Sequence, residues 1–209
     1  MNRSSKMWPV FLVTAFAAAC NGNGNLRVDG HLSEASASQG SVGSLPLGDG
    51  TLVVERASVS VSELELEGAE EDSDELEASV GGGTIELALD GSKTKVAANS
   101  VESGVYHTLG MELRSRAIAV EGTYGENSFT YVSDVSPELE FAISPAVEVP
   151  AGGEASVGVE FDVASWFVAA DGSVLDPTDE ANRPAIEENI LASMAAHAEV
   201  EGDDGPDDD

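Results

Sequence analysis

The sequence predicts a mainly β protein, an antiparallel β-sandwich with one helix near the C-terminus. From residue 51 onward, apolar and polar residues alternate in about eight short runs, which is typical of strands with one solvent-facing side. Glycine and proline separate these runs at short intervals, as they do in sandwiches. A small β-barrel has a similar number of strands and stays as the alternative.

The first long strand is predicted to contain a bulge. In residues 57–61 the apolar side chains stand at odd positions, whereas in residues 63–67 they stand at even positions. A shift of phase by one residue within a strand indicates a β-bulge, which we place near Ser62 and Glu63.

The later strands follow the same pattern. Alternate residues are apolar in residues 85–89, 105–113, 139–143 and 155–163, apart from His107. His107 falls on the same predicted face as Val105 and Leu109. Asp90 and Gly91 form a turn-type pair after the first of these runs. The set of strands resembles immunoglobulin-like or transthyretin-like sandwiches.

A change of period predicts the helix. Ile186, Ile190 and Met194 recur at helical spacing after Pro184, which suits a first turn. We expect the helix over residues 184–198, covering one end or face of a domain that spans residues 51–200. Residues 201–209 are almost entirely acidic and are predicted to be a disordered tail. Residues 20–50 are rich in Gly, Ser and Asn, which predicts a flexible tether before the domain.

Residues 1–19 have the layout of a secretory signal peptide. Arg3 and Lys6 precede an apolar run over residues 10–19, which ends in small residues directly before Cys20. A helix of this length rises only about 15 Å, roughly half of a bilayer core, so it is too short to span a membrane. Cys20 is the only cysteine, so the sequence predicts neither a disulfide nor a redox site.

These residues resemble the signal peptides of bacterial lipoproteins, in which a small-residue box precedes an obligatory cysteine. Ala17, Ala18, Ala19 and Cys20 match that box, although Ala17 stands where leucine is commonest. The resemblance implies cleavage between Ala19 and Cys20 and lipid attachment to the Cys20 thiol. Asn21 is not the aspartate that retains enteric lipoproteins at the inner membrane, which favours the outer membrane. The alternative is an ordinary cleaved signal peptide with an incidental cysteine nearby.

A second resemblance covers most of the chain after Cys20. The segments that carry it are the Glu-Leu repeat at 63–67, IELALDG at 85–91, GVYHTLGMEL at 104–113, VEFDVASWF at 159–167 and DGSVLDP at 171–177. In this order they resemble a group of uncharacterised bacterial envelope lipoproteins with a β-sandwich domain. The tails of such relatives often look like Asp-rich calcium loops, but Pro206 interrupts the tail here. The group brings no known activity.

The chain is strongly acidic, with 39 Asp and Glu residues against nine Lys and Arg, and a net charge of −30. Loss of Arg3 and Lys6 with the signal peptide would make the mature charge about −32. This charge excludes binding to nucleic acid through its phosphates, which requires clustered Lys and Arg. The favoured explanation is a diffuse adaptation to a salty medium, since the acids are spread throughout. Weak calcium binding is the alternative, at the acidic clusters Glu70, Glu71, Asp72, Asp74 and Glu75 or Asp203, Asp204, Asp207, Asp208 and Asp209.

The sequence shows no pattern for a catalytic or metal site, so none is assigned. The three histidines are far apart: His31 in the predicted tether, His107 on a strand and His197 at the predicted end of the helix. Trp166 and Phe167 suit either an exposed platform for a sugar or partner, or core packing against the following helix, which is favoured.

We therefore expect an exported, lipid-anchored cell-envelope protein that displays a non-catalytic β-sandwich for structural, adhesive or binding duty. The membrane is contacted through the lipid, and the expected partner is an envelope protein or a polysaccharide. No cofactor is expected beyond weakly bound calcium. The alternatives are an assembly accessory, such as a pilus-like subunit that pairs through an edge strand, and an envelope hydrolase that depends on His107.

Overall fold

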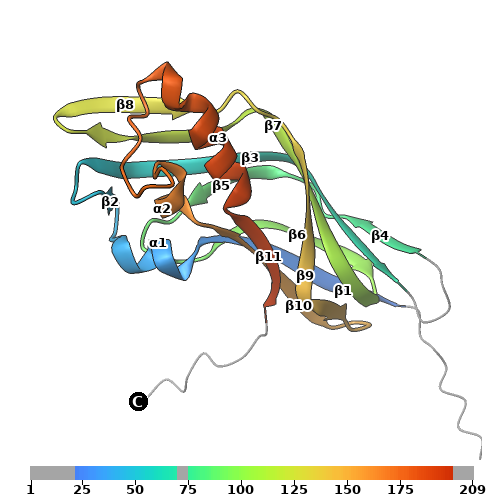
Figure 1. The fold of residues 1–209 in the computed structure, drawn as a ribbon. Helices are drawn as coiled ribbons and strands as arrows, with labels where there is room; N and C mark the ends of the chain where they lie inside the picture. The colour runs from blue at the N-terminus through green and yellow to red at the C-terminus, as the bar shows by residue number, and fades with distance from the viewer. Residues whose placement is uncertain (1–21, 70–74, 200–209) are drawn as a thin grey trace, which may run out of the picture.

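The computed structural model describes residues 22–69 and 75–199 (Figure 1). This part of the chain is mainly β and forms two sheets that are not closed into a barrel, with a short helix near its C-terminal end. The prediction of a β-sandwich is therefore confirmed, and the barrel alternative is wrong. No helix within the described residues is long and apolar enough to cross a membrane.

The smaller sheet has four strands in the order β11-β10-β1-β6. These strands are β1 (Asn23–Leu32), β6 (Thr94–Glu102), β10 (Glu154–Phe161) and β11 (Met194–Glu199). The pairs β1–β6 and β10–β11 are antiparallel, as predicted, whereas β1 and β10 run parallel. The parallel pair joins the first strand of the described chain to a strand more than a hundred residues later, in the middle of one sheet.

Two long strands hold the larger sheet together. Strands β3 (Leu52–Ala69) and β7 (Gly104–Tyr124) pair with each other along most of their length. Strand β3 also pairs with β2 (Leu45–Leu47), β4 (Glu75–Ser79) and β5 (Gly83–Leu87), and β7 also pairs with β8 (Asn127–Val132) and β9 (Glu138–Val149). The register between β3 and β7 shifts between Val61 and Glu63, which confirms the predicted bulge.

The core is built by the alternation that the sequence predicts. Buried side chains from the predicted apolar faces include Val59, Val61, Leu64, Leu66, Ile85, Leu87, Leu109, Met111, Val157, Val159 and Phe161. A turn follows β5, in which the Gly91 N–H donates to the Ala88 carbonyl, and Gly91 has a φ of +82° that favours glycine. For β3, β5 and β10 the period-two pattern therefore identified both the strand and its inward face.

The prediction of a flexible tether over residues 20–50 is wrong for the part that the structure describes. Strand β1 occupies a central position in the smaller sheet, and α1 (Glu34–Gln39) and β2 follow it. Leu26, Val28 and Leu32 of β1 are buried at alternate positions. Gly30 stands between them, where a Cβ would lie 2.7 Å from Ile85 Cγ2. The close approach of Ile85 requires the glycine, so its presence here does not indicate flexibility.

A buried polar network fixes the serine-rich stretch after β1. The Ser36 side chain is buried, and its Oγ donates to Asp162 Oδ1 at 2.7 Å while accepting from the Ala164 N–H at 2.8 Å. The Ser33 Oγ donates to the same Asp162 oxygen at 3.0 Å, and it accepts from the Ser36 N–H as the N-cap of α1. These serines attach α1 to the end of β10.

The helices α1, α2 (Val163–Trp166) and α3 (Arg183–Ala192) lie toward one end of the sandwich, and β1 begins at the other end (Figure 1). The predicted helix over residues 184–198 is correct in position but too long, because the observed helix α3 ends at Ala192 and β11 follows it. Met194 and Ala196 are buried at alternate positions and pair with β10. Met194 fits both a helical and an alternating pattern, and pairing with the sheet decides its conformation.

Trp166 and Phe167 are fully buried at the helical end. The Trp166 Nε1–H donates to Ser193 Oγ at 2.7 Å, and Phe167 makes edge-on ring contacts with Phe129 and Tyr131. Core packing is therefore confirmed, and an exposed aromatic platform at these two residues is excluded.

Candidate functional site

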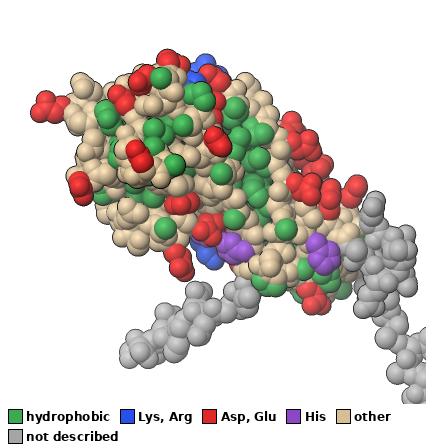
Figure 2. Space-filling view, in the orientation of Figure 1, with side chains coloured by type: hydrophobic (Ala, Val, Ile, Leu, Met, Phe, Trp, Pro, Cys, Tyr) green, Lys and Arg blue, Asp and Glu red, His purple; other side chains and the backbone are tan. Residues whose placement is uncertain are grey.

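The structure brings two of the three histidines together on the outer face of the four-stranded sheet. His31 on β1 and His197 on β11 have ring centroids 5.2 Å apart in an edge-on arrangement. In Figure 2, histidine side chains appear at two separate places on the displayed face, one of them beside basic and acidic side chains. We call the group His31, His197 and Glu199, described below, the histidine cluster.

His107 does not belong to this cluster, and its predicted place on the core face of β7 is wrong. The register between β7 and β9 shifts between Tyr106 and Thr108, so Tyr106 takes the buried position. Its hydroxyl donates to the Glu102 carbonyl at 2.8 Å. His107 is consequently exposed. A bulge moves side chains to the other face of a strand, and alternation alone did not reveal this second bulge.

Strand β10 sets the geometry of the histidine cluster because it lies between β1 and β11. His31 is opposite Glu160, and His197 is opposite Gly158. A Cβ on Gly158 would lie 2.7 Å from Glu199 Oε1, 2.8 Å from His197 Nε2 and 2.9 Å from His31 Cε1. The three side chains therefore converge over a position that has no side chain of its own.

Glu199 is the acidic member of the cluster, and its side chain is only 8% exposed. Its Oε1 lies 2.9 Å from Lys93 Nζ and 3.9 Å from His31 Nδ1. His31 Nδ1 is buried and has no hydrogen-bond partner among the residues that the structure describes. Buried nitrogen atoms of this kind are normally bonded, so this one is available to a ligand.

Burial is the main cause that lowers the pKa of His31, and the neighbouring His197 lowers it further. Lys93 acts in the same direction, while Glu199 and Glu160 oppose it. Because the pKa falls below its ordinary value, His31 is neutral at neutral pH and keeps a lone pair on one ring nitrogen.

An open hollow of about 740 Å³ adjoins the histidine cluster and extends over the start of α1. Its lining includes His31, His197, Glu160, Ser33 and Asp162. These two histidines and these two acidic residues thus line the hollow, from β1, β10, β11 and the residue that follows β10. This arrangement is able to bind a metal ion or to hydrogen-bond a polar ligand.

A second hollow of about 390 Å³ lies farther along the same sheet face and is lined by residues that include Arg27, Lys95, Asn99 and Glu154. Next to it, Asp29 is fully buried, and its carboxylate oxygens lie 2.8 and 2.6 Å from Arg27 Nε. This ion pair compensates the buried charge of Asp29. Because the charge has a partner within β1, we assign no ligand to it.

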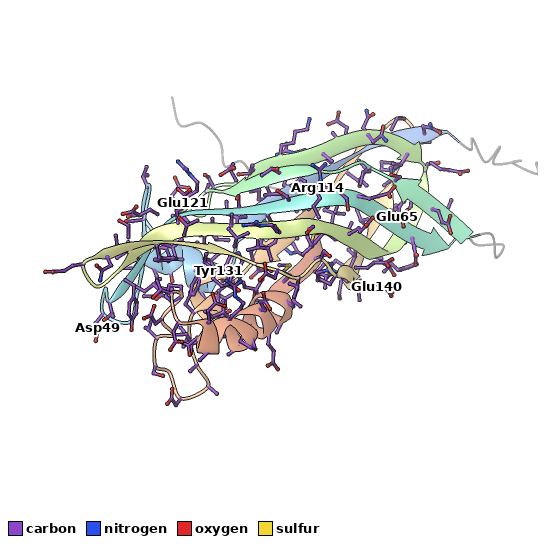
Figure 3. The ribbon with its side chains drawn as sticks, turned by 90° about the horizontal axis from the view of Figure 1, so that it is seen from above. Asp49, Glu65, Arg114, Glu121, Tyr131 and Glu140 are labelled. Atoms are coloured by element: carbon purple, nitrogen blue, oxygen red, sulfur yellow. The ribbon has the colours of Figure 1, made fainter. Side chains whose placement is uncertain are left out.

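The outer face of the larger sheet carries rows of glutamates. Glu63, Glu112 and Glu138 lie directly opposite one another on β3, β7 and β9. Two residues further along β3, β7 and β9, Glu65 and Glu140 lie on either side of Gly110. Figure 3 shows both glutamates toward the same end of the sheet. Like charges at such positions repel one another. The repulsion, chiefly from Glu63, raises the pKa of Glu65 above its ordinary value.

Replacing Glu65 by glutamine should raise the melting temperature at neutral pH, because it removes a charge from this row. A carboxyl group whose pKa is raised in the folded state destabilises that state once pH exceeds the pKa. The stability of the wild-type chain should therefore increase as pH falls through the raised pKa. The difference between wild type and Glu65→Gln should shrink in the same interval. Thermal melts of both chains between about pH 4 and pH 8, a range that runs from ordinary carboxyl pKa values to above neutral pH, measure this difference in melting temperature.

Glu126→Gln, in the exposed turn between β7 and β8, is the matched control for the loss of one negative charge. Added sodium chloride should also narrow the difference for Glu65→Gln, since salt screens exposed charges. A melting temperature that is unchanged or lower for Glu65→Gln at pH 7 would contradict a repulsive row.

Sequence reasoning missed Glu199, the acidic member of the histidine cluster, and the two residues beside the cluster, Lys93 and Gly158. Glu199, Lys93 and Gly158 stand in no recognisable motif, and His31 was placed in a tether. The available signal was the alternation of Leu26, Val28 and Leu32, which predicts a strand and puts His31 on its outer face. The parallel pairing of β1 with β10 connects distant parts of the chain, and no local pattern predicts it.

The predicted sites at Ala19 and Cys20 lie outside the described residues. The same holds for the acidic loop from Glu70 to Asp74 and for the tail over residues 201–209. Glu75 is described as the first residue of β4.

Comparison with known proteins gives no relative. No family model, no curated protein and no solved structure matches the chain.

Proposed function

We propose that the chain is a lipid-anchored protein of the bacterial cell envelope, with the outer membrane favoured, whose β-sandwich has a non-catalytic binding role. The observation that supports this proposal is the position of the first described strand. Strand β1 starts at Asn23, so only Asn21 and Gly22 separate it from Cys20, the single cysteine. Three residues span at most about 11 Å when fully extended. A lipid on Cys20 would therefore hold the sandwich directly at the bilayer surface.

Such an anchor suits the charge of the domain. Anionic lipid headgroups repel a protein with a net charge of −30, so electrostatic attraction does not retain it at a membrane. A single acyl chain gives only marginal binding, whereas two or more anchor a protein stably. The binding role is supported by the hollow beside the histidine cluster and by His31 Nδ1, a buried nitrogen that has no hydrogen-bond partner among the described residues.

Cys20→Ala should abolish lipid attachment and release the protein from the membrane fraction. In a bacterial host grown with a labelled fatty acid, the wild-type chain should carry label and sediment with membranes. The Cys20→Ala chain should carry no label, because the thiol that accepts the lipid is absent. Asn21→Gln is the matched control and should keep both label and membrane association. A wild-type chain that carries no label would contradict the proposed anchor.

Pairing through an edge strand is the second candidate, and β6 is one edge of the smaller sheet. Its Asn99 Nδ2 donates to the Ser79 carbonyl at 3.1 Å, and its Thr94 Oγ1 donates to the Glu86 carbonyl at 2.9 Å. These bonds connect β6 to the larger sheet, which disfavours addition of a foreign strand at this edge. The hydrolase alternative depended on His107, which is exposed and lies apart from the other two histidines.

A further inference from the structure

We propose that His31, His197 and Glu199 bind a first-row transition-metal ion of the Zn²⁺ type on the outer face of the four-stranded sheet. Each residue offers one ligand atom, and these atoms lie within 4.8 Å of one another. The proposal is independent of the lipid anchor, since every ligand belongs to the folded domain.

The donor set selects the class of metal. Two imidazole nitrogens and one carboxylate oxygen are a common ligand set for Zn²⁺. Calcium and magnesium prefer sites built from oxygen atoms, so this cluster does not suit them. The weak calcium binding considered for the acidic loop and tail is a separate matter, because those residues, apart from Glu75, lie outside the described part of the chain.

The geometry needs only small side-chain adjustments. Zinc–ligand bonds of about 2.1 Å in a tetrahedral site place ligand atoms about 3.4 Å apart. His31 Nδ1 and Glu199 Oε1 are already 3.9 Å apart. Both histidine rings and the carboxylate meet over Gly158, where the missing Cβ leaves space. The buried His31 Nδ1 has no hydrogen-bond partner among the described residues, and its lone pair would form a coordination bond with the metal.

The ammonium group of Lys93 would compete with the metal ion for the carboxylate of Glu199. Its Nζ lies 2.9 Å from Glu199 Oε1, whereas its side chain is 50% exposed and is able to move into solvent. Metal binding would exchange this ion pair for a metal–carboxylate bond. Lys93 should therefore weaken binding, an effect opposite in sign to that of the three ligands.

Three protein ligands leave the fourth position of a tetrahedral ion open. The hollow of about 740 Å³ reaches the cluster at His31 and His197, so the open position would be accessible to water or to a donor atom of a bound molecule. The metal would also connect β1 with β11 across β10. Strands β1 and β11 are the strands nearest the two ends of the described chain.

The test is a titration of the full chain, purified in detergent, with ZnCl₂ in the presence of excess MgCl₂ and CaCl₂. The excess ions occupy the diffuse carboxylates and the acidic tail, so that calorimetry reports only a site selective for zinc. One Zn²⁺ per chain is expected. His197→Ala and His31→Gln should each weaken binding by at least about tenfold. Gly158→Ala should weaken it as well, because its methyl group fills the space between the ligands.

Two further variants separate this site from adventitious binding. Lys93→Met should tighten zinc binding, because it removes the competing ammonium group, and His107→Ala should leave the affinity unchanged. Circular dichroism without metal identifies any ligand variant that fails to fold, and Lys93→Met then decides the result. Absence of a saturable site under these conditions would overturn the proposal. So would equal affinity in wild type and a folded His197→Ala chain, or a Lys93→Met chain that binds no more tightly.

Discussion

A chain shortened to residues 33–209 should not form a stable domain. The shortening removes β1, which lies between β10 and β6 in the smaller sheet. It also removes the buried side chains of Leu26, Val28 and Leu32, which are each worth about 1.5–3 kcal/mol. Their sum is comparable with the whole stability of a typical domain, about 5–15 kcal/mol. The backbone groups of both neighbouring strands would also lose their partners.

A chain of residues 22–209 is the control, since it keeps every described element. It should show one cooperative thermal transition by circular dichroism, whereas the chain of residues 33–209 should show none. If the two chains melted within a few degrees of each other, β1 would be dispensable. The residues before Ser33 would then behave as the tether that their composition suggests.

Trp166→Ala should destabilise the domain by about 3–5 kcal/mol, the usual cost of removing a large buried aromatic side chain. Trp166 is fully buried, and its truncation would leave a cavity at the helical end of the sandwich. It would also deprive Ser193 Oγ of the N–H that now donates to it at 2.7 Å. Urea denaturation of residues 22–209, followed by circular dichroism, gives the free energy of unfolding directly.

Trp166→Phe divides this effect into its two parts. Phenylalanine keeps much of the buried ring but has no N–H to donate, so the loss should be about 1–3 kcal/mol, smaller than for alanine. Phe167→Ala tests the neighbouring position, which is equally buried but makes only apolar ring contacts. A loss below about 1 kcal/mol for Trp166→Ala would mean that the helical end is not packed as described.

Alternation in the sequence predicted β3, β5, β7 and β9 of the larger sheet and β10 of the smaller one, because many of their inward positions hold Val, Ile and Leu. It did not reveal β2 and β4, which fall in the predicted tether and in the acidic stretch. It failed for β1, where glycine and polar residues outnumber the three buried apolar side chains. Ser33 and Ser36 gave the same misleading impression, since serine is common in linkers as well as in buried networks. Their acceptor, Asp162, is distant in the sequence, so only the fold reveals the network.

The candidate site was less predictable than the fold. Metal motifs are recognised when their ligands are close in sequence, but His31 and His197 come from opposite ends of the described chain. Their proximity depends on two strand pairings and on the absence of a side chain at Gly158. The fold class follows from local periodicity, whereas this cluster follows from topology.

The parallel pairing of β1 with β10 also determines when the domain is able to fold. A chain that crosses a membrane N-terminus first delivers β1 long before β10, so the smaller sheet cannot close until about residue 161 has crossed. Contacts between such distant segments make folding slow and leave strand edges unpaired for a time. Repulsion between the large negative charges of such partly folded chains would oppose their aggregation. The acidity that contributes little to the folded core would thus protect the protein during the export that we propose.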